Sequence, residues 1–283
     1  MREKETAMEP NELLVYLQDG ITAFVEGSSG NYISMRSALS PSAAGLKLFD
    51  PPLIGVAAAN DPLFEEMRDE KAVGKQMLMP TDWLEGAQSV VSYFLPMSER
   101  VRQSNLEGDL ASPEWFHARI EGQMFIMRLG EQVVRLLKAA GYDTVCPACH
   151  PNMKAAFYDE DPSVAYNSNW SERHIAYICG LGTFSLTRGI ITEKGMAGRL
   201  GSVVTAATLP VTERQYSGID DYCIKCGACI DRCPVNAISL ETGKDNYACH
   251  NALLESKKIY PGYVGCGKCQ VGVPCEFARP AQP

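Results

Sequence analysis

The chain has 283 residues, of which 46% are hydrophobic and 21% are charged, as in soluble globular proteins. The formal net charge of −8 and the absence of any block of Lys and Arg argue against a nucleic-acid-binding surface. No apolar run approaches the ~20 residues of a membrane span, and the charged start of the chain lacks the apolar core of a signal peptide. We therefore expect a cytoplasmic protein with neither a nucleic-acid nor a membrane partner.

The first hundred residues predict helices and strands in alternation. Apolar residues at helical spacing predict a helix over residues 11–26. The uncharged runs 53–59 and 89–95 predict two buried strands, and a helix is expected between them over residues 62–74, opened by Asn60-Asp61-Pro62. This rhythm favours a layered α/β or α+β domain.

The longest predicted helix begins after Ser112, a suitable N-cap, and ends near Gly141. A stripe at helical spacing is expected to face the core, and it comprises Phe116, Ile120, Met124, Met127, Val134 and Leu137.

A further helix is expected to be capped by Asn169 and to end at Gly180. Strand-like segments follow at residues 190–191 and 201–209. We expect a linker at residues 210–221, which would divide the chain into a cofactor-binding domain over residues 1–212 and a cysteine-rich domain over residues 213–283.

The cysteines are concentrated in that second segment, with eight of the 11 after residue 222. The run C-x2-C-x2-C-x3-C-P is typical of ferredoxins that carry two [4Fe–4S] clusters, in which the fourth cysteine serves the other cluster. This pattern assigns Cys223, Cys226, Cys229 and Cys275 to a first cluster, and Cys233, Cys249, Cys266 and Cys269 to a second. A zinc ribbon from Cys226, Cys229, Cys266 and Cys269 is the alternative, but it leaves the other four thiols unexplained.

The segments 53–59, 83–91, 172–182 and 201–205, together with the cysteine-rich tail, resemble epoxyqueuosine reductases and, more remotely, reductive dehalogenases. The resemblance implies an α+β fold: a nitroreductase-like mixed sheet flanked by helices, followed by a ferredoxin-like domain with two [4Fe–4S] clusters. It also implies a base-off cobalamin between the two domains, which receives electrons through the clusters.

The sequence departs from that family in three ways. Five residues rather than three separate Cys269 from Cys275, and nothing after the tail matches a tRNA-binding repeat region. The proton-donating aspartate expected six residues before Glu172 is replaced by Tyr166, so maturation of queuosine is not expected. Dehalogenases use a tyrosine as proton donor. Tyr166 and Glu172 are therefore the candidate catalytic residues, and the alternative for Tyr166 is a buried tyrosine with a hydrogen-bonded hydroxyl.

Two glycine-containing segments are candidates for a cofactor wall, because glycine lets the backbone approach a flat macrocycle closely. Turns and bulges would explain the same glycines. The candidate cofactor-binding residues are Gly180, Gly182, Thr183, Phe184, Gly201, Ser202 and Val203.

Cys146-Pro-Ala-Cys149-His150 matches both a haem c attachment motif and a redox dithiol. Haem c attachment requires export, for which the sequence shows no signal. A functional thiol pair, an additional metal site and plain structural cysteines remain open.

These observations lead to two hypotheses. The first is a corrinoid-dependent iron–sulfur reductase that takes electrons from a ferredoxin or flavodoxin and reduces a small organic substrate. The second is an electron-transfer or corrinoid-reducing carrier without substrate chemistry of its own. A flavin in place of the corrinoid is a further alternative.

Overall fold

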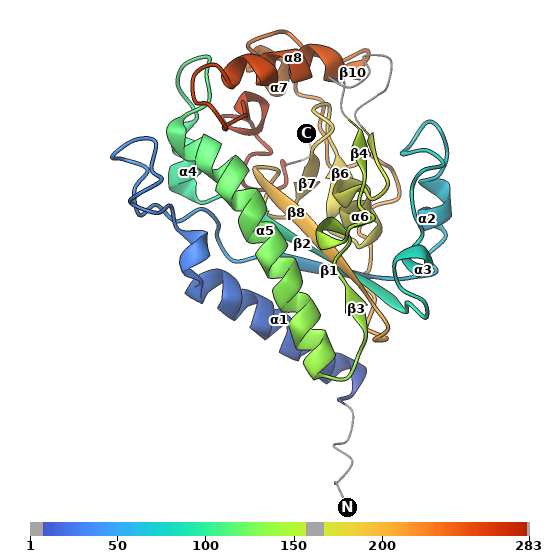
Figure 1. Ribbon diagram of the computed structural model, residues 1–283. Coiled ribbons are helices and arrows are strands. Elements are labelled where there is room, and N and C mark those ends of the chain that lie inside the picture. The colour runs from blue at the N-terminus through green and yellow to red at the C-terminus, as the bar shows by residue number, and fades with distance from the viewer. Residues whose placement is uncertain (1–7, 157–166, 282–283) are drawn as a thin grey trace, which may run out of the picture.

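The computed structural model describes residues 8–156 and 167–281 (Figure 1). The helices are α1 (Pro10–Gly27), α2 (Leu63–Glu66), α3 (Pro80–Trp83), α4 (Glu99–Ser104), α5 (Pro113–Ala139), α6 (Glu172–Ile178), α7 (Ala228–Asp231) and α8 (Asn246–Ser256), with short 3-10 turns η1 (Ser29–Asn31), η2 (Pro147–Cys149) and η3 (Lys268–Gln270). The strands are β1 (Leu53–Ala58), β2 (Ser89–Pro96), β3 (Thr144–Val145), β4 (Ala155–Ala156), β5 (Asn167–Ser168), β6 (Gly182–Phe184), β7 (Ile190–Thr192), β8 (Gly198–Thr205), β9 (Ile238–Ser239) and β10 (Gly243–Lys244).

The central sheet has the strand order β1-β2-β8-β3, and three antiparallel two-stranded ribbons surround it: β4 with β5, β6 with β7, and β9 with β10. The predicted α+β class, with a sheet flanked by helices, is confirmed. Every strand pair in the described residues is antiparallel, so the expected mixture of parallel and antiparallel strands is not found there. None of the described helices is long and apolar enough to cross a membrane.

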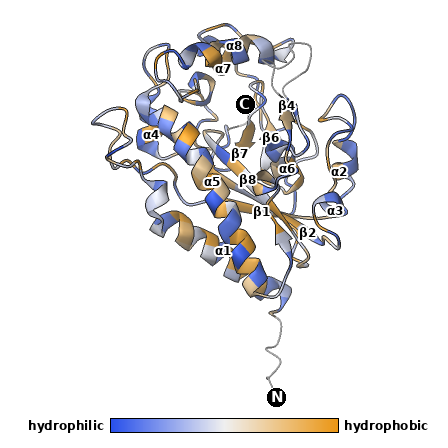
Figure 2. Ribbon diagram, viewed as in Figure 1, coloured by the Kyte–Doolittle hydropathy of each residue, from blue (hydrophilic) through white to orange (hydrophobic). Residues whose placement is uncertain are grey.

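The side chains of β2 point alternately to the two faces of the sheet, and both faces are covered by other parts of the protein. Val91 and Tyr93 pack into the core that lies under α1 and α5, whereas Val90 and Phe94 pack into a second core with residues of α2, α3 and α6. Successive side chains of a strand point to opposite faces, so an uninterrupted apolar run needs two apolar layers. Figure 2 shows the hydrophobic colouring continuing through this sheet.

The helix over residues 11–26 and the two strands are confirmed by α1, β1 and β2. The helix expected over residues 62–74 stops at Glu66. The chain then folds back, and the carbonyl of Met67 accepts hydrogen bonds from the N–H groups of Val73 and Gly74 instead of from the next turn of a helix.

Helix α5 begins and ends where predicted, and the Ser112 hydroxyl accepts the hydrogen bond of the Trp115 N–H. Its predicted buried face is wrong in part: Phe116 and Leu137 are buried, but Met124 and Met127 are 51% and 38% exposed. The core side of the middle of the helix consists of Phe125, Ile126, Leu129 and Val133, because the helix packs on α1 as well as on the sheet.

Helix α6 starts two residues later than its predicted cap would require, since Ser171 occupies the N-cap position. Asn169 is used elsewhere: its side chain bonds the backbone of Lys154 and Asn152 and holds two loop segments together. The end of the helix is as predicted, because Gly180 takes a left-handed conformation with φ of 82° that a side chain disfavours.

Candidate functional site

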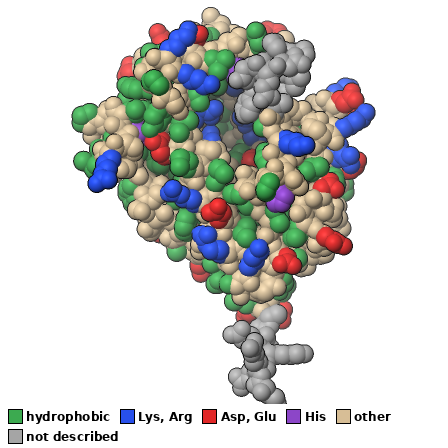
Figure 3. Space-filling model, viewed as in Figure 1, with side chains coloured by type: hydrophobic (Ala, Val, Ile, Leu, Met, Phe, Trp, Pro, Cys, Tyr) green, Lys and Arg blue, Asp and Glu red, His purple; other side chains and the backbone are tan. Residues whose placement is uncertain are grey.

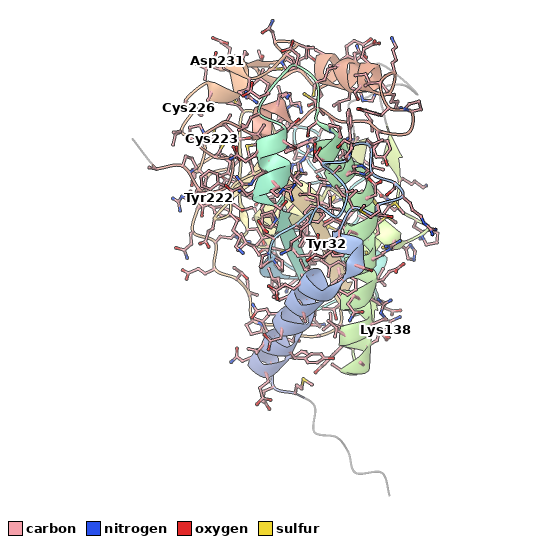
Figure 4. The ribbon with its side chains drawn as sticks, turned by 90° about the vertical axis from the view of Figure 1, so that its left-hand side faces the viewer. Tyr32, Lys138, Tyr222, Cys223, Cys226 and Asp231 are labelled. Atoms are coloured by element: carbon pink, nitrogen blue, oxygen red, sulfur yellow. The ribbon has the colours of Figure 1, made fainter. Side chains whose placement is uncertain are left out.

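The cysteine-rich tail forms a cavity against the ribbon β6–β7. Four thiols line this cavity: Cys223, Cys226, Cys229 and Cys275. We call them the first thiol group. Ser185, Leu186 and Ile191, from the ribbon and the turn within it, form the opposite wall. Figure 4 shows Cys223 and Cys226 beside Tyr222 at one side of the molecule, far from Lys138 at the end of α5.

Burial and neighbouring thiols both act on the cysteines of this group. Burial raises the pKa of Cys275 to about 12, with contributions from the charges of Cys223, Cys229 and Cys226. Burial raises the pKa of Cys229 to about 11, with contributions from Cys223, Cys226 and Cys233. The four sulfurs therefore lie close enough to repel one another when ionised, as ligands of one polynuclear centre must.

The remaining four cysteines of the tail form a second thiol group. Burial raises the pKa of Cys266, and the charges of Cys249 and Cys233 raise it further. Burial raises the pKa of Cys269 to about 12, with Cys266 and Cys249 adding to the shift and Lys244 opposing it. The charge of Cys233 acts on Cys266 and also on Cys229, so its membership of the second group stays a prediction from the ferredoxin pattern.

Within residues 8–156 and 167–281, no three His, Cys, Asp or Glu side chains converge closely enough to hold a single metal ion. A zinc ribbon requires such convergence, because its four ligands surround one point at about 2.3 Å. The thiols of a [4Fe–4S] cluster bind four different irons and need not converge in this way. The donor set, which is thiolate only, suits the cluster.

Backbone contacts hold the second thiol group against the body of the protein. The Cys233 sulfur accepts a hydrogen bond from the Ala237 N–H at 3.2 Å. Asn105, which is fully buried at the end of α4, donates from Nδ2 to the Cys266 carbonyl at 2.9 Å. Gly267 packs on the ring of Trp115, where a Cβ would lie 2.0 Å from ring atoms.

The first thiol group is held in a similar way by the ribbon. The Met196 N–H donates to the Cys275 carbonyl at 2.9 Å, and the two side-chain sulfurs are 3.3 Å apart. The Tyr222 N–H, next to Cys223, donates to the hydroxyl of Thr183 at 2.9 Å. A predicted cofactor residue therefore supports the loop that carries the first thiols.

Glu172 is the end of a buried chain of hydrogen bonds. The Trp170 indole N–H donates to the Ser202 hydroxyl at 2.9 Å, and that hydroxyl donates to Glu172 Oε2 at 2.7 Å. Glu172 Oε1 is buried and has no hydrogen-bond partner among residues 8–156 and 167–281. Burial raises the pKa of Glu172 to about 7, although the hydrogen bond from Ser202 opposes the shift. This carboxyl can therefore hold or release a proton near neutral pH.

The predicted glycine wall is packed against protein atoms. A Cβ on Gly182 would lie 1.9 Å from the Ile191 carbonyl oxygen, and one on Gly201 would lie 2.6 Å from the Tyr93 ring. At Gly180 the nearest atom would belong to Thr212, at 2.9 Å. These three glycines are explained by close approaches within the fold.

The other predicted cofactor residues differ in accessibility. Val203 is fully buried in the core, and Thr183 and Ser202 are buried with their hydroxyls in use. Phe184 is only half-buried, and its ring lies 4.8 Å from that of His174. Tyr166 lies outside the described residues. Three residues that support the site were not predicted from the sequence: Asn105, Met196 and Trp170. None of them lies in a recognisable motif, and each contacts a residue that is far away along the chain.

A comparison with known families supports the iron–sulfur character of the start of the tail. Residues 218–239 match a 4Fe-4S binding domain, so this segment belongs to an iron–sulfur protein. No protein in the curated collection matches the chain.

Solved structures with a similar fold include a catabolic reductive dehalogenase, NpRdhA, in complex with 3-bromo-4-hydroxybenzoic acid. It shares 15% identity over 94% of this chain and 36% of its own, with a TM-score of 0.54. A selenomethionine-labelled epoxyqueuosine reductase shares 16% identity over 81% of this chain and 63% of its own, with a TM-score of 0.51.

An epoxyqueuosine reductase bound to a tRNA-Tyr stem loop has a lower TM-score of 0.47, with 17% identity over 81% of this chain and 63% of its own. RNA binding is a property of that relative, and the comparisons do not support the expectation that this chain lacks a nucleic-acid partner. The chain spans 36% to 63% of the length of these three structures. The resemblance predicted from the sequence is confirmed at the level of the fold, which this chain shares with reductive dehalogenases and epoxyqueuosine reductases.

Proposed function

We propose that this chain is an iron–sulfur reductase that holds two [4Fe–4S] clusters and a base-off corrinoid and reduces a small organic substrate. One observation carries the proposal: the cavity of the first thiol group is shared with the ribbon β6–β7, which contains the candidate cofactor residues Gly182–Phe184. Electrons arriving at the tail would leave it at this wall. When bound, the clusters supply low-potential electrons and the corrinoid supplies a cobalt centre that accepts them.

Several features of the chain suit this role. We propose that the first thiol group holds the cluster nearer the cofactor and that the second group holds the cluster nearer the electron donor, a ferredoxin or flavodoxin. Residues 1–212 would form the cofactor-binding domain and residues 213–283 the cluster domain. Figure 3 shows a hollow below α7 and α8 with Lys and Arg side chains in its wall. Positive charge there suits the phosphate of a corrinoid or of a flavin.

Glu172 is proposed as a proton source for the reduced substrate. Its carboxyl is buried, one oxygen has no partner in the part of the chain that the structure describes, and its pKa of about 7 allows proton donation at neutral pH. Ser202 and Trp170 orient it through the hydrogen-bond chain. Tyr166 remains a second candidate for the same step.

The alternative proposal is an electron carrier that reduces a corrinoid or flavin without substrate chemistry of its own. It is favoured by the packing of Gly180, Gly182 and Gly201 against protein atoms, which leaves less exposed backbone for a macrocycle than expected. An RNA substrate is a third outcome, given the tRNA-bound protein of this fold, although the net charge of −8 opposes it.

The experiment is anaerobic reconstitution with iron, sulfide and hydroxocobalamin, followed by gel filtration and ultraviolet–visible spectroscopy. We expect corrin absorbance to elute with the protein and to change when a low-potential reductant is added. Cys226→Ser is the matched control, because it should retain corrin yet slow the reduction of cobalt through the protein. Loss of all corrin absorbance on gel filtration would overturn the corrinoid assignment, and a flavin spectrum in the purified protein would replace it with the flavin alternative.

A further inference from the structure

The motif Cys146-Pro-Ala-Cys149 forms a tight turn beside β8, apart from both thiol groups of the tail. The Cys149 N–H donates to the Cys146 carbonyl at 3.0 Å, which closes the turn around η2. Turns of this kind hold the first and fourth Cα atoms within about 7 Å. Disulfides span Cα separations of roughly 4.4–6.8 Å, so the backbone already lies close to the required geometry.

The two sulfurs of this turn are in direct contact while both cysteines are free. Cys146 Sγ donates a hydrogen bond to Cys149 Sγ across 3.1 Å. The bond length of a disulfide is about 2.05 Å, so roughly 1 Å of movement would join them. A pair of purely structural cysteines has no need of this alignment.

The two thiols differ in access and in acidity. Cys146 is only 6% exposed and lies against Gly130, whereas Cys149 is half-buried. The hydrogen bond from Cys146 lowers the pKa of Cys149, and it outweighs burial and the charges of Glu131 and Glu172, which act in the opposite direction. The same hydrogen bond, followed by burial, raises the pKa of Cys146. Such a division suits an attacking thiol and a resolving thiol.

The Cys149 thiol also contacts the backbone of α5. It donates a hydrogen bond to the carbonyl oxygen of Met127 at 3.5 Å. A sulfur that is only partly accessible favours a narrow, flexible reactant over a folded protein surface.

We propose that Cys146 and Cys149 form a redox-active dithiol that reduces a small aliphatic disulfide by thiol–disulfide exchange. The Cys149 thiolate attacks one sulfur of the disulfide, whose S–S bond breaks, and the first thiolate leaves and is protonated by solvent. Cys146 then attacks the Cys149 sulfur in the mixed disulfide, and its proton goes to the second leaving thiolate. Two electrons pass from the two cysteines to the small disulfide, which departs as two thiols.

The test uses the cluster-reconstituted full chain, kept anaerobic, with oxidised glutathione and oxidised dithiothreitol as probes. After acid quenching and alkylation, peptide mass mapping reports the state of the segment that contains Cys146 and Cys149. We expect an internal disulfide that forms with oxidant and disappears with excess reductant. Cys146→Ser should instead accumulate glutathione on Cys149, and Cys149→Ser should slow thiol release by roughly tenfold or more.

Cys179→Ser is the matched control, because Cys179 is fully buried and its Sγ contacts the Val90 carbonyl, away from the pair. It should behave as the unaltered protein. The proposal is overturned if the segment stays reduced in the most oxidising mixture, or if Cys146→Ser traps no glutathione while its circular dichroism spectrum shows that it is folded.

Discussion

At the scale of single residues, Glu172 shows how a buried carboxyl acquires a useful pKa. Its helix α6 starts at this residue, which directs the carboxyl toward Ser202 of β8 rather than into solvent. Burial without a cationic partner disfavours the charged form, and one hydrogen bond from a hydroxyl compensates only in part. The same carboxyl that would donate protons should therefore cost stability when it is ionised.

Glu172→Gln should make the protein more resistant to unfolding as the pH rises. Between about pH 4.5 and pH 7 the unfolded chain releases the proton while the folded chain keeps it, so the free energy of unfolding of the unaltered protein falls with pH and levels off above pH 7. The penalty reaches roughly 3 kcal/mol, at 1.36 kcal/mol for each unit of pKa difference. The glutamine variant has no titrating carboxyl at this position, so its free energy of unfolding should not fall with pH for this reason.

Thermal unfolding of both proteins from pH 5 to pH 8.5 measures the difference. The gain in melting temperature of the variant should widen with pH up to about pH 7 and then stay constant. Glu26→Gln, at an exposed position of α1, is the control and should show no such widening. A gain that is the same at every pH would contradict the assigned pKa.

At the scale of elements, α4 links the body to the tail. Asn105 follows the last residue of this helix and bonds in three directions: Nδ2 donates to the Cys266 carbonyl, Oδ1 accepts from the Ser112 N–H, and the backbone carbonyl accepts from Lys268 Nζ. Lys268 is only 2% exposed and also bonds the Glu107 carbonyl. One residue thus anchors the start of α5 and the loop of the second thiol group.

Asn105→Ala should loosen that loop and accelerate the loss of iron from the second thiol group. Removing the side chain leaves the Cys266 carbonyl and the Ser112 N–H without their partner, at a cost of roughly 1–3 kcal/mol for each buried group. Iron release to a chelator, followed by absorbance, measures the effect. Gln103→Ala on the same helix is exposed and serves as control. Equal release rates for the two variants would show that Asn105 does not anchor the loop.

At the scale of the whole molecule, we propose that the two thiol groups exchange members. Cys275, the last cysteine, lines the cavity of the first run, and Cys233 of that run is proposed to join Cys249, Cys266 and Cys269. Because each group draws on both ends of the tail, the tail should fold as a single unit rather than as two successive loops.

Two double variants distinguish this exchange from ligation in chain order. Cys226→Ser with Cys275→Ser removes two ligands of one proposed cluster, so iron should fall from about eight to about four atoms per chain. Cys226→Ser with Cys233→Ser removes one ligand from each, so nearly all iron should be lost. The opposite result, with iron retained in the second variant and lost in the first, would establish ligation in chain order. Iron analysis and electron paramagnetic resonance provide the measurement.

Local patterns in the sequence were sufficient for the iron–sulfur character of the tail and for the main elements. Ligand spacing within one loop is a local property, as are the Ser112 cap of α5 and the apolar run of β2, so they could be predicted from neighbouring residues. The buried face of α5 could not, because it depends on α1 lying alongside. Which helix covers which side is a property of packing.

Contacts between distant segments determined the geometry of the candidate site. The Glu172 oxygen without a hydrogen-bond partner among the described residues, and the anchoring of Cys266 by Asn105, each depend on how separate elements meet. The candidate cofactor glycines illustrate the same limit: glycine reports that something approaches closely, but only the fold reveals that the approaching atoms belong to Ile191 and Tyr93. Residue type specifies which chemistry a side chain offers, whereas burial and distance, which arise only on folding, set its pKa and its partner.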